Sequence, residues 1–315
     1  MRGRAAGGSL AGLACKAVRD LRRPSFPVDA AAQPDGMPPG PPGRYPLDLR
    51  PMTARSPLDH EGLVVTRTAT GDAYRNPVSI SLYALGRHTG ALAEGRPGAD
   101  RALVTQAAWL RAAQDGNGGW RYPVPVPRYG VRPGWYSAMA QGLAVSVLLR
   151  AHAVTGERSF LDAGEGAAEL MLRPVGDGGC ADYDRHGRPF PEECPSDPAS
   201  HILNGAVFAL FGLLELGRTR HRPAHQPMAD RLREALPDFD LGYWTRYDLR
   251  HSAPATLAYH CLHAALLTAA GKVLGDPRWL TVAARWDGYT RSPAGRVRAA
   301  AGKGRFVLRE YRAGS

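Results

Sequence analysis

The sequence predicts an all-α fold: an incomplete α/α toroid of about four helical hairpins, preceded by a short β-hairpin or extended lead-in. From residue 77 onward apolar residues recur at spacings of three and four, most clearly in AMAQGLAVSVLLRAH (138–152) and ILNGAVFALFGLLEL (202–216), and this spacing is typical of helices. Several of these helices are apolar nearly all round, which indicates burial on both sides. Aromatic-rich loops such as GGWRYP and GYWTRYDLRH lie between the helical pairs. Hairpins arranged in a ring, with such loops at one end, describe a toroid with a concave face.

Composition divides the chain into four parts. Residues 1–44 are rich in Gly, Pro, Ala and Arg, and such a segment cannot bury enough apolar surface to offset its ordering entropy, so we expect a disordered arm. Residues 45–76 contain turn signals and one strand-like run, 62–68, which predicts an extended or hairpin lead-in. The helical domain follows over 77–292, and a basic tail over 293–315 ends the chain.

Helix boundaries are signalled by proline and glycine. Pro77 suits the first position of a helix, and Gly156, Gly217 and Gly275 suit helix ends. The expected helices cover 77–86, 100–114, 135–155, 159–172, 200–217, 227–236, 254–274 and 276–290.

The charge balance favours an anionic partner. The chain has 315 residues and a net charge of +11, from 40 Lys+Arg against 29 Asp+Glu, and almost all of the basic residues are Arg. Arginine binds carboxylate, sulfate or phosphate through two parallel hydrogen bonds. No helix-turn-helix, zinc-finger or RNA-recognition signature is present, so no nucleic-acid partner is expected. A high-GC codon bias is the alternative source of the arginines.

Targeting and cysteine patterns point to a cytoplasmic protein. No run approaches the roughly 20 apolar residues that span a bilayer, so no membrane association is expected. The apolar stretch near the N-terminus is short, Gly-rich and broken by Lys16, which makes a poor signal peptide. Cys15, Cys180, Cys194 and Cys261 are widely spaced and form no CxxC pair, so neither a zinc knuckle nor a redox pair is indicated. A disulfide between Cys180 and Cys194 stays open.

Three segments resemble the C-terminal helical domain of the D-glucuronyl C5-epimerases, the heparosan-N-sulfate-glucuronate 5-epimerases. They are 132–156, 192–216 and 247–267, which include GWYSAMAQG and YDLRH in that order. The segment NPVSISLYALGRHTG (76–90) is similar to the motif that precedes this domain in the family. The resemblance covers about residues 45–292 and implies the toroid fold.

Two departures from the family pattern stand out. Animal members carry a large β-domain between the positions of His88 and Ala102, where this chain has only a dozen residues, so that domain is absent here. Family members typically read Glu-Glu-Tyr-Pro where this chain has Cys194 as the third residue, so a tyrosine hydroxyl is missing. The resemblance leaves both a monomer and a homodimer open.

The resemblance implies epimerisation of D-glucuronic acid to L-iduronic acid in a glycan. The weakly acidic C5 proton must be removed from one face and returned to the other, while the neighbouring carboxylate is neutralised. The family pattern assigns Arg250 as the carboxylate clamp, Tyr259 and Tyr247 as acid/base tyrosines, and Glu193 as the carboxylate base. Without the resemblance, a salt bridge from Arg250 to Asp248 or another nearby acid would be the simpler interpretation.

Further candidates for substrate binding lie in the same segments and in the aromatic loops, since sugar rings stack on Trp and Tyr. The histidines His260 and His263 are spaced to hold a metal, but no HExxH motif or further carboxylate accompanies them. We therefore expect hydrogen bonding to substrate or a proton relay from them, and no metal or cofactor. The binding candidates, besides Arg250, are His251, His260, His263, Asn204, Trp135, Tyr136, Gln141, Tyr83 and Trp120.

Other functions remain open at this level. A polysaccharide lyase would use the same arginine and tyrosines to abstract the C5 proton, and would then expel the C4 substituent. A glycoside hydrolase on the same scaffold needs two carboxylates across the cleft, and Glu193 has no convincing partner. A glycan-binding relative without catalysis is the alternative that Cys194 raises.

Overall fold

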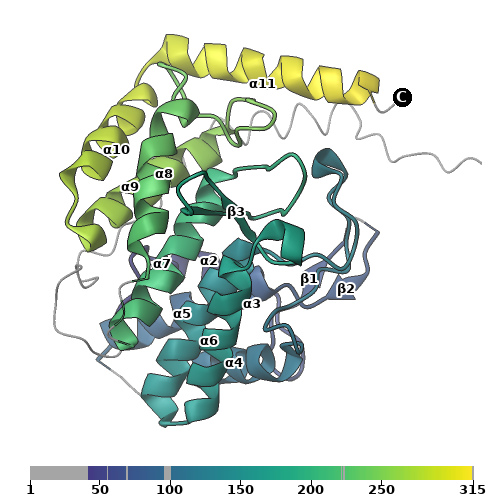
Figure 1. The fold of residues 1–315 in the computed structure, drawn as a ribbon, viewed down its shortest axis with the longest axis vertical. Helices are drawn as coiled ribbons and strands as arrows, with labels where there is room; N and C mark the ends of the chain where they lie inside the picture. Colours follow the sequence, from purple (N-terminus) through teal and green to yellow (C-terminus); the bar gives the residue numbers. More distant parts are fainter. Residues whose placement is uncertain are drawn as a thin grey trace, which may run out of the picture.

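We analysed a computed structural model, which describes residues 42–54, 56–68, 70–95, 101–220, 222 and 224–313. Nearly all of the predicted N-terminal arm (1–44) lies outside these residues. The described chain is mainly helical, with two small antiparallel sheets (Figure 1). The all-α prediction is therefore confirmed. The closure of the helical pairs into an incomplete ring stays a prediction.

Helix α2 and strands β1 and β2 come first, and the longer helices follow, with β3 and β4 between α6 and α7. The helices are α2 Arg50–Thr53, α3 Pro77–Ala93, α4 Arg101–Ala113, α5 Ala138–Thr155, α6 Arg158–Leu172, α7 Leu203–Thr219, α8 Gln226–Phe239, α9 Leu257–Leu274, α10 Pro277–Tyr289 and α11 Pro293–Ala313. The strands are β1 Thr66–Arg67, β2 Ala73–Tyr74, β3 Ala181–Tyr183 and β4 Pro189–Pro191, and single 3₁₀ turns cover Pro127–Tyr129 and Val175–Asp177.

Side-chain caps place several helix starts later than apolar spacing does. The helix predicted from residue 135 begins at Ala138, because the hydroxyl of Ser137 accepts a hydrogen bond from the Ala140 N–H. The helix predicted from residue 254 begins at Leu257, because Thr256 caps it in the same way. Such caps satisfy backbone donors that the first turn leaves unpaired.

Helix α3 runs past its predicted end at Gly86, as far as Ala93. A Cβ atom at Gly86 would lie 2.6 Å from the Leu49 carbonyl oxygen. This glycine therefore permits the close approach of α2 and does not end the helix. At the other end of the chain, the residues that we set apart as a basic tail form α11, which lies across one end of the other helices (Figure 1).

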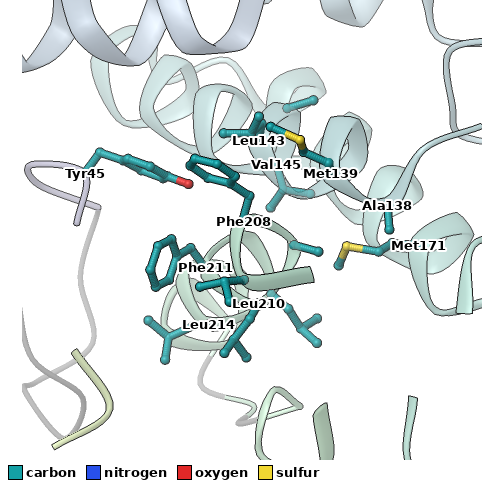
Figure 2. Close-up of a cluster of buried hydrophobic side chains, with 14 of the residues drawn as sticks. Tyr45, Ala138, Met139, Leu143, Val145, Met171, Phe208, Leu210, Phe211 and Leu214 are labelled. Carbon is teal, nitrogen blue, oxygen red and sulfur yellow. The ribbon is translucent and has the colours of Figure 1, made fainter. Parts of the chain in front are cut away.

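The core lies where α5 packs against α6 and α7. Leu143 and Val145 of α5 and Phe208 and Leu210 of α7 are buried in one cluster (Figure 2). Tyr45 of the lead-in adds its ring, edge-on to a phenylalanine of α7 with 5.9 Å between ring centroids. The lead-in thus completes the core and has fixed structure.

A buried ion pair ties α5 to the C-terminal half of α7. The guanidinium of Arg150 donates to both carboxylate oxygens of Glu215, at 2.7 and 2.8 Å, and donates to the Gly43 carbonyl at 3.0 Å. The side chain of Arg150 is fully buried, and that of Glu215 is 5% exposed. A two-pronged pair of this kind satisfies charges that would otherwise be costly to bury.

Two helices resemble membrane spans by composition. Helices α5 and α9 are 18 residues long with a mean hydropathy of 1.2, so by length and composition alone each could cross a membrane, which the sequence had not led us to expect. Within the fold 78% of α5 and 61% of α9 are buried. Core helices meet the same criteria, so this is weak evidence for a membrane. Cys180, Cys194 and Cys261 are buried, and none of the three forms a disulfide.

Candidate active site

Four side chains that are far apart in the sequence meet at one end of α7 and α9. Glu193 follows β4, Asn204 lies in the first turn of α7, Tyr247 lies in the loop before α9, and Tyr259 lies in the first turn of α9. The rings of Tyr247 and Tyr259 contact edge to face, with centroids 4.7 Å apart. The charge of Glu193 raises the pKa of both tyrosines. We refer to these four residues as the Glu193 cluster.

Glu193 is a half-buried residue whose carboxyl group has few hydrogen-bond donors. It accepts a hydrogen bond from the Asn204 side-chain amide at 3.0 Å, and the Gly205 N–H lowers its pKa slightly. Burial outweighs these donors and raises its pKa to about 7. No described arginine or lysine forms an ion pair with it. A carboxyl group with this pKa is suited to take up and release a proton at neutral pH.

The backbone around Glu193 is shaped for close packing. A Cβ atom at Gly205 would lie 2.5 Å from the Glu193 carboxylate and 2.6 Å from its Cβ. Only glycine therefore lets the loop after β4 lie against the first turn of α7. The amide of Asn204 is 3% exposed and its Oδ1 has no described partner, so one acceptor faces the cluster unused.

The neighbouring Glu192 has a structural role. It is fully buried and accepts hydrogen bonds from the backbone and hydroxyl of Ser200 and from the His201 N–H at 3.0 Å. The ring of His201 also bonds to Asp182 at 2.9 Å. Glu192 thus folds the 192–202 loop onto β3, which fixes the position of Glu193.

Both cluster tyrosines hold their protons at neutral pH. Burial raises the pKa of Tyr247 far above its usual value, and the charges of Glu193 and Tyr259 raise it further. Burial and the charge of Glu193 also raise the pKa of Tyr259. A hydrogen bond from Tyr247 partly offsets this rise. Tyr259 is 38% exposed. The pair therefore presents phenol O–H donors beside a carboxyl base, and the Tyr259 residue is partly exposed.

The cation nearest to the tyrosines is Arg128, which the sequence analysis did not single out. Its guanidinium carbon lies 5.7 Å from the ring centroid of Tyr247 and 4.7 Å from that of Phe306 on α11. It donates to Asp248 at 2.7 Å, and this fully buried carboxylate also accepts from the Tyr129 hydroxyl at 2.9 Å. The Nε–H of Arg128 is buried and has no partner among the described residues.

Arg250 faces away from this cation. One of its nitrogens donates to the backbone carbonyls of Tyr129 at 3.1 Å and Pro198 at 3.0 Å. It does not form the salt bridge to Asp248 that we considered, because Arg128 occupies that carboxylate. The structure therefore does not bring Arg250 into the Glu193 cluster, although it is only three residues from Tyr247. Its side chain lines a hollow beside the cluster.

Three other residues of these loops lie next to the cluster. His251 bonds to Asp248 through both its backbone N–H, at 2.6 Å, and its ring. Trp135 stacks on Tyr122 with centroids 4.3 Å apart, and both Trp135 and Tyr247 pack against the buried cluster that contains Cys194. Burial and nearby carboxylates raise the pKa of the Cys194 thiol, so it stays neutral. The sequence analysis did not name Tyr122 as a site residue, although Tyr122 belongs to the aromatic loop GGWRYP.

His260 and His263 are placed in the core and away from the cluster. Both rings are fully buried and share the hydroxyl of Thr245, at 2.9 and 3.1 Å. His260 stacks on Trp244 and bonds to the carbonyl of Trp286. Burial lowers the pKa of His263 to about 3, so its ring is neutral. These contacts do not support the predicted contact with substrate.

Four more binding candidates are packed into the interior. Trp120 donates its indole N–H to a carbonyl of α4 at 2.9 Å, and the hydroxyl of Tyr136 donates to Asp115 at 2.5 Å. The amide of Gln141 donates to two backbone carbonyls, at 2.9 and 3.3 Å. Tyr83 is 8% exposed within the main core. Their polar groups and rings stabilise the fold, and the structure does not bring them to the Glu193 cluster.

Comparisons with known proteins cover this part of the chain. A family model described as D-glucuronyl C5-epimerase C-terminus matches residues 114–288, which include the whole Glu193 cluster. The chain is 32% identical over 214 residues to the D-glucuronyl C5-epimerase of Caenorhabditis elegans, across 60% of this chain and 35% of that protein. It is 27% identical over 137 residues to an uncharacterised protein of Methanocaldococcus jannaschii, across 41% of this chain and 44% of that protein. It therefore spans less than half the length of either relative.

Proposed function

The chain belongs to the family described as the D-glucuronyl C5-epimerase C-terminus, and on that premise we propose that it converts D-glucuronic acid to L-iduronic acid within a glycan. The observation that supports this most is the half-buried Glu193 carboxyl group, which pairs with no described cation and has a pKa raised to about 7. Two tyrosine hydroxyl groups lie beside it. A base and separate proton donors are what inversion at C5 requires.

In the proposed reaction the ionised Glu193 takes the C5 proton, and the electron pair of the C–H bond moves toward the uronate carboxyl group. A phenol O–H of the pair, which we assign to Tyr259, then delivers its proton to the opposite face of C5. Tyr247 is hydrogen-bonded to Tyr259 and stabilises the resulting phenolate until solvent restores its proton. Glu193 releases the abstracted proton to solvent, so atoms and charges balance over one turnover.

The enolate-like intermediate needs a cation near the uronate carboxyl group. We assign this role to Arg128 rather than to Arg250. Arg128 lies over the ring of Tyr247 and has a buried N–H that no described residue accepts. A guanidinium held by Asp248 is fixed before substrate arrives, and fixed charges cost little reorganisation during the reaction.

The proposed substrate is a uronic-acid glycan of the heparosan type. Its charge suits the arginine-rich composition, and the incomplete toroid predicted from the sequence would offer it a concave face. A uronan lyase is the second candidate, because the 38% exposure of Tyr259 would also let its proton reach a leaving oxygen at C4.

Incubation with heparosan-type and other uronic-acid glycans in D₂O, followed by NMR at C5, tests the proposal. Deuterium uptake at C5 without chain cleavage is the expected result. An ultraviolet absorbance of unsaturated uronate would instead assign a lyase. Binding of a uronan by calorimetry with protium retained at C5 in every substrate would contradict catalysis and favour a glycan-binding relative.

A further inference from the structure

A hollow of about 520 Å³ lies beside the Glu193 cluster. Loop residues 129–135 form one wall, residues 195–197 form another, and Val175 and Arg250 complete it. None of these residues takes part in the reaction proposed above. The hollow therefore needs an explanation of its own.

The hollow carries two arginines and one acid. Arg132 is exposed and Arg250 is half-buried, while Asp197 supplies the single carboxylate in the lining. Among the described residues no acid pairs with either arginine. Two hydrogen bonds to backbone carbonyls hold Arg250 in place, which leaves its other N–H groups without a described partner. A fixed guanidinium with spare donors is suited to bind an anion through two parallel hydrogen bonds.

The hollow shares its walls with the Glu193 cluster. Trp135 lines the hollow and also packs against the buried cluster that contains Cys194, the residue after Glu193. Tyr129 lines the hollow and accepts a hydrogen bond from Arg250 at its carbonyl, while its hydroxyl donates to Asp248, which is also paired with Arg128. Pro195, also in the lining, lies two residues from Glu193. A glycan with one residue at Glu193 would therefore have a neighbouring residue beside this hollow.

We propose that the hollow between Arg132, Arg250 and Trp135 binds an acidic group, carboxylate or sulfate, on a sugar residue that flanks the reacting uronate. The site then recognises an acidic oligosaccharide and not a single uronate. This inference rests on the proposed function for the identity of the flanking residue. The two binding roles fall to different cations, since Arg128 serves the reacting carboxyl group while Arg250 and Arg132 serve its neighbour.

The test compares Arg132→Ala with Arg87→Ala, a matched control. Arg87 is an exposed arginine of α3 with no partner among the described residues, and it lies outside the hollow. The measurement is the KM for C5 deuterium exchange on a short and a longer acidic oligosaccharide. We expect R132A to raise the KM of the longer substrate about tenfold, which corresponds to about 1.4 kcal/mol, with a smaller effect on the shorter one. R87A should match the wild-type protein on both. An equal KM for R132A and wild type on the longer substrate would overturn the inference.

Calorimetric binding separates this inference from the proposed function. If the wild-type protein shows no exchange but binds the longer oligosaccharide, and R132A weakens that binding about tenfold, then the epimerase proposal fails and the hollow stands. If exchange occurs but R132A neither changes KM nor weakens binding, then the hollow fails alone. Two modified substrates identify the acidic group: one with the carboxyl groups of the flanking residues reduced, and one with the sulfates removed. The group in question is the one whose modification abolishes the difference between R132A and wild type.

Discussion

Two glutamates contact helix α7 near its two ends, and they differ in their partners. Glu215, in the C-terminal half of α7, is paired with two nitrogens of Arg150. Glu193, in the loop after β4, packs on the first turn of α7 and receives one amide hydrogen bond from Asn204 and no described cation. The first arrangement pairs a buried carboxylate with a cation. The second leaves the carboxyl group near balance between its two protonation states, which is what proton transfer requires.

The same helix explains why the second glutamate is tolerated. The first turn of a helix exposes N–H groups and the positive end of its dipole, and these moderate the cost of burying Glu193 without pairing it. Gly205 allows the close packing that brings the carboxyl group there. The same helix thus stabilises the fold at one end and packs against the proposed reactive group at the other.

The largest expected effect comes from Glu193→Gln. Glutamine keeps the shape and the hydrogen bond but cannot take up the C5 proton, so exchange should fall by about 10²- to 10⁴-fold. The melting temperature should not fall, because no ion pair is lost. Deuterium exchange by NMR and thermal unfolding measure the two outcomes. Full activity in this variant would remove Glu193 from the proposed reaction.

Tyr259→Phe should lower exchange by about a hundredfold, since it removes one donor while the ring still packs on Tyr247. Tyr183→Phe is a matched control, because Tyr183 is similarly exposed as a residue and its hydroxyl donates to the Leu172 carbonyl, away from the cluster. Rates for the two variants are compared on the same glycan. Equal rates would show that the hydroxyl of Tyr259 is not used.

Glu215→Gln should have the opposite pattern to the Glu193 variant. It leaves the buried Arg150 without its carboxylate, so the free energy of unfolding should drop by about 3–5 kcal/mol. At a temperature where the variant stays folded, kcat should be unchanged. Urea unfolding followed by circular dichroism gives the stability. A variant as stable as wild type would mean that this pair does not hold α5 to α7.

A smaller effect is expected from Arg128→Lys, which keeps the charge but loses the planar fork. We expect kcat to fall about tenfold while KM changes little, because the interaction strengthens in the transition state. Arg250→Lys should instead act mainly on KM. If kcat falls for Arg250→Lys and not for Arg128→Lys, then the role of clamp belongs to Arg250, as the sequence first suggested.

The fold was largely predictable because periodic apolar residues report burial directly. The runs in α5 and α7 predicted core helices, and these helices form the core. Apolar spacing could not locate the helix starts, because capping by Ser137 and Thr256 determines them. It also could not show that Gly86 lies inside a helix, because that glycine is explained only by its contact with α2.

The site was less predictable, because side-chain direction in loops depends on distant partners. Glu193, Tyr247 and Tyr259, which the family resemblance assigned to acid/base roles, lie in one cluster with Asn204, and their roles stay a prediction. Arg250 and Tyr247 are three residues apart yet face different surroundings, since the carbonyls of two other loops hold the arginine. Arg128 carried no motif, and only the fold brings it to Asp248, which lies 120 residues away in the sequence.

The core histidines teach the same lesson. His260 and His263 have the spacing of a functional pair, but that spacing is equally met by two rings that share one buried hydroxyl. Only the environment distinguishes the two cases. A polar residue in an apolar helix therefore needs its partner identified before a role is assigned.

The pKa of Glu193 also predicts how pH acts on the molecule. Because burial raises it to about 7 from the usual 4.5, the folded protein binds an extra proton between these values. The contribution of Glu193 to stability is therefore greatest below about pH 4.5 and is lost as pH rises to about 7. The rate of exchange should rise over the upper part of the same range, as the base becomes ionised.

Titration of the side-chain carboxyl carbons by NMR, in protein labelled at glutamate, tests the role of Glu193 most directly. One resonance should titrate near pH 7 and be missing from the Glu193→Gln variant. If the Glu193 resonance titrated near 4.5, the carboxyl group would be an ordinary acid, and the account of Glu193 as the C5 base would be contradicted.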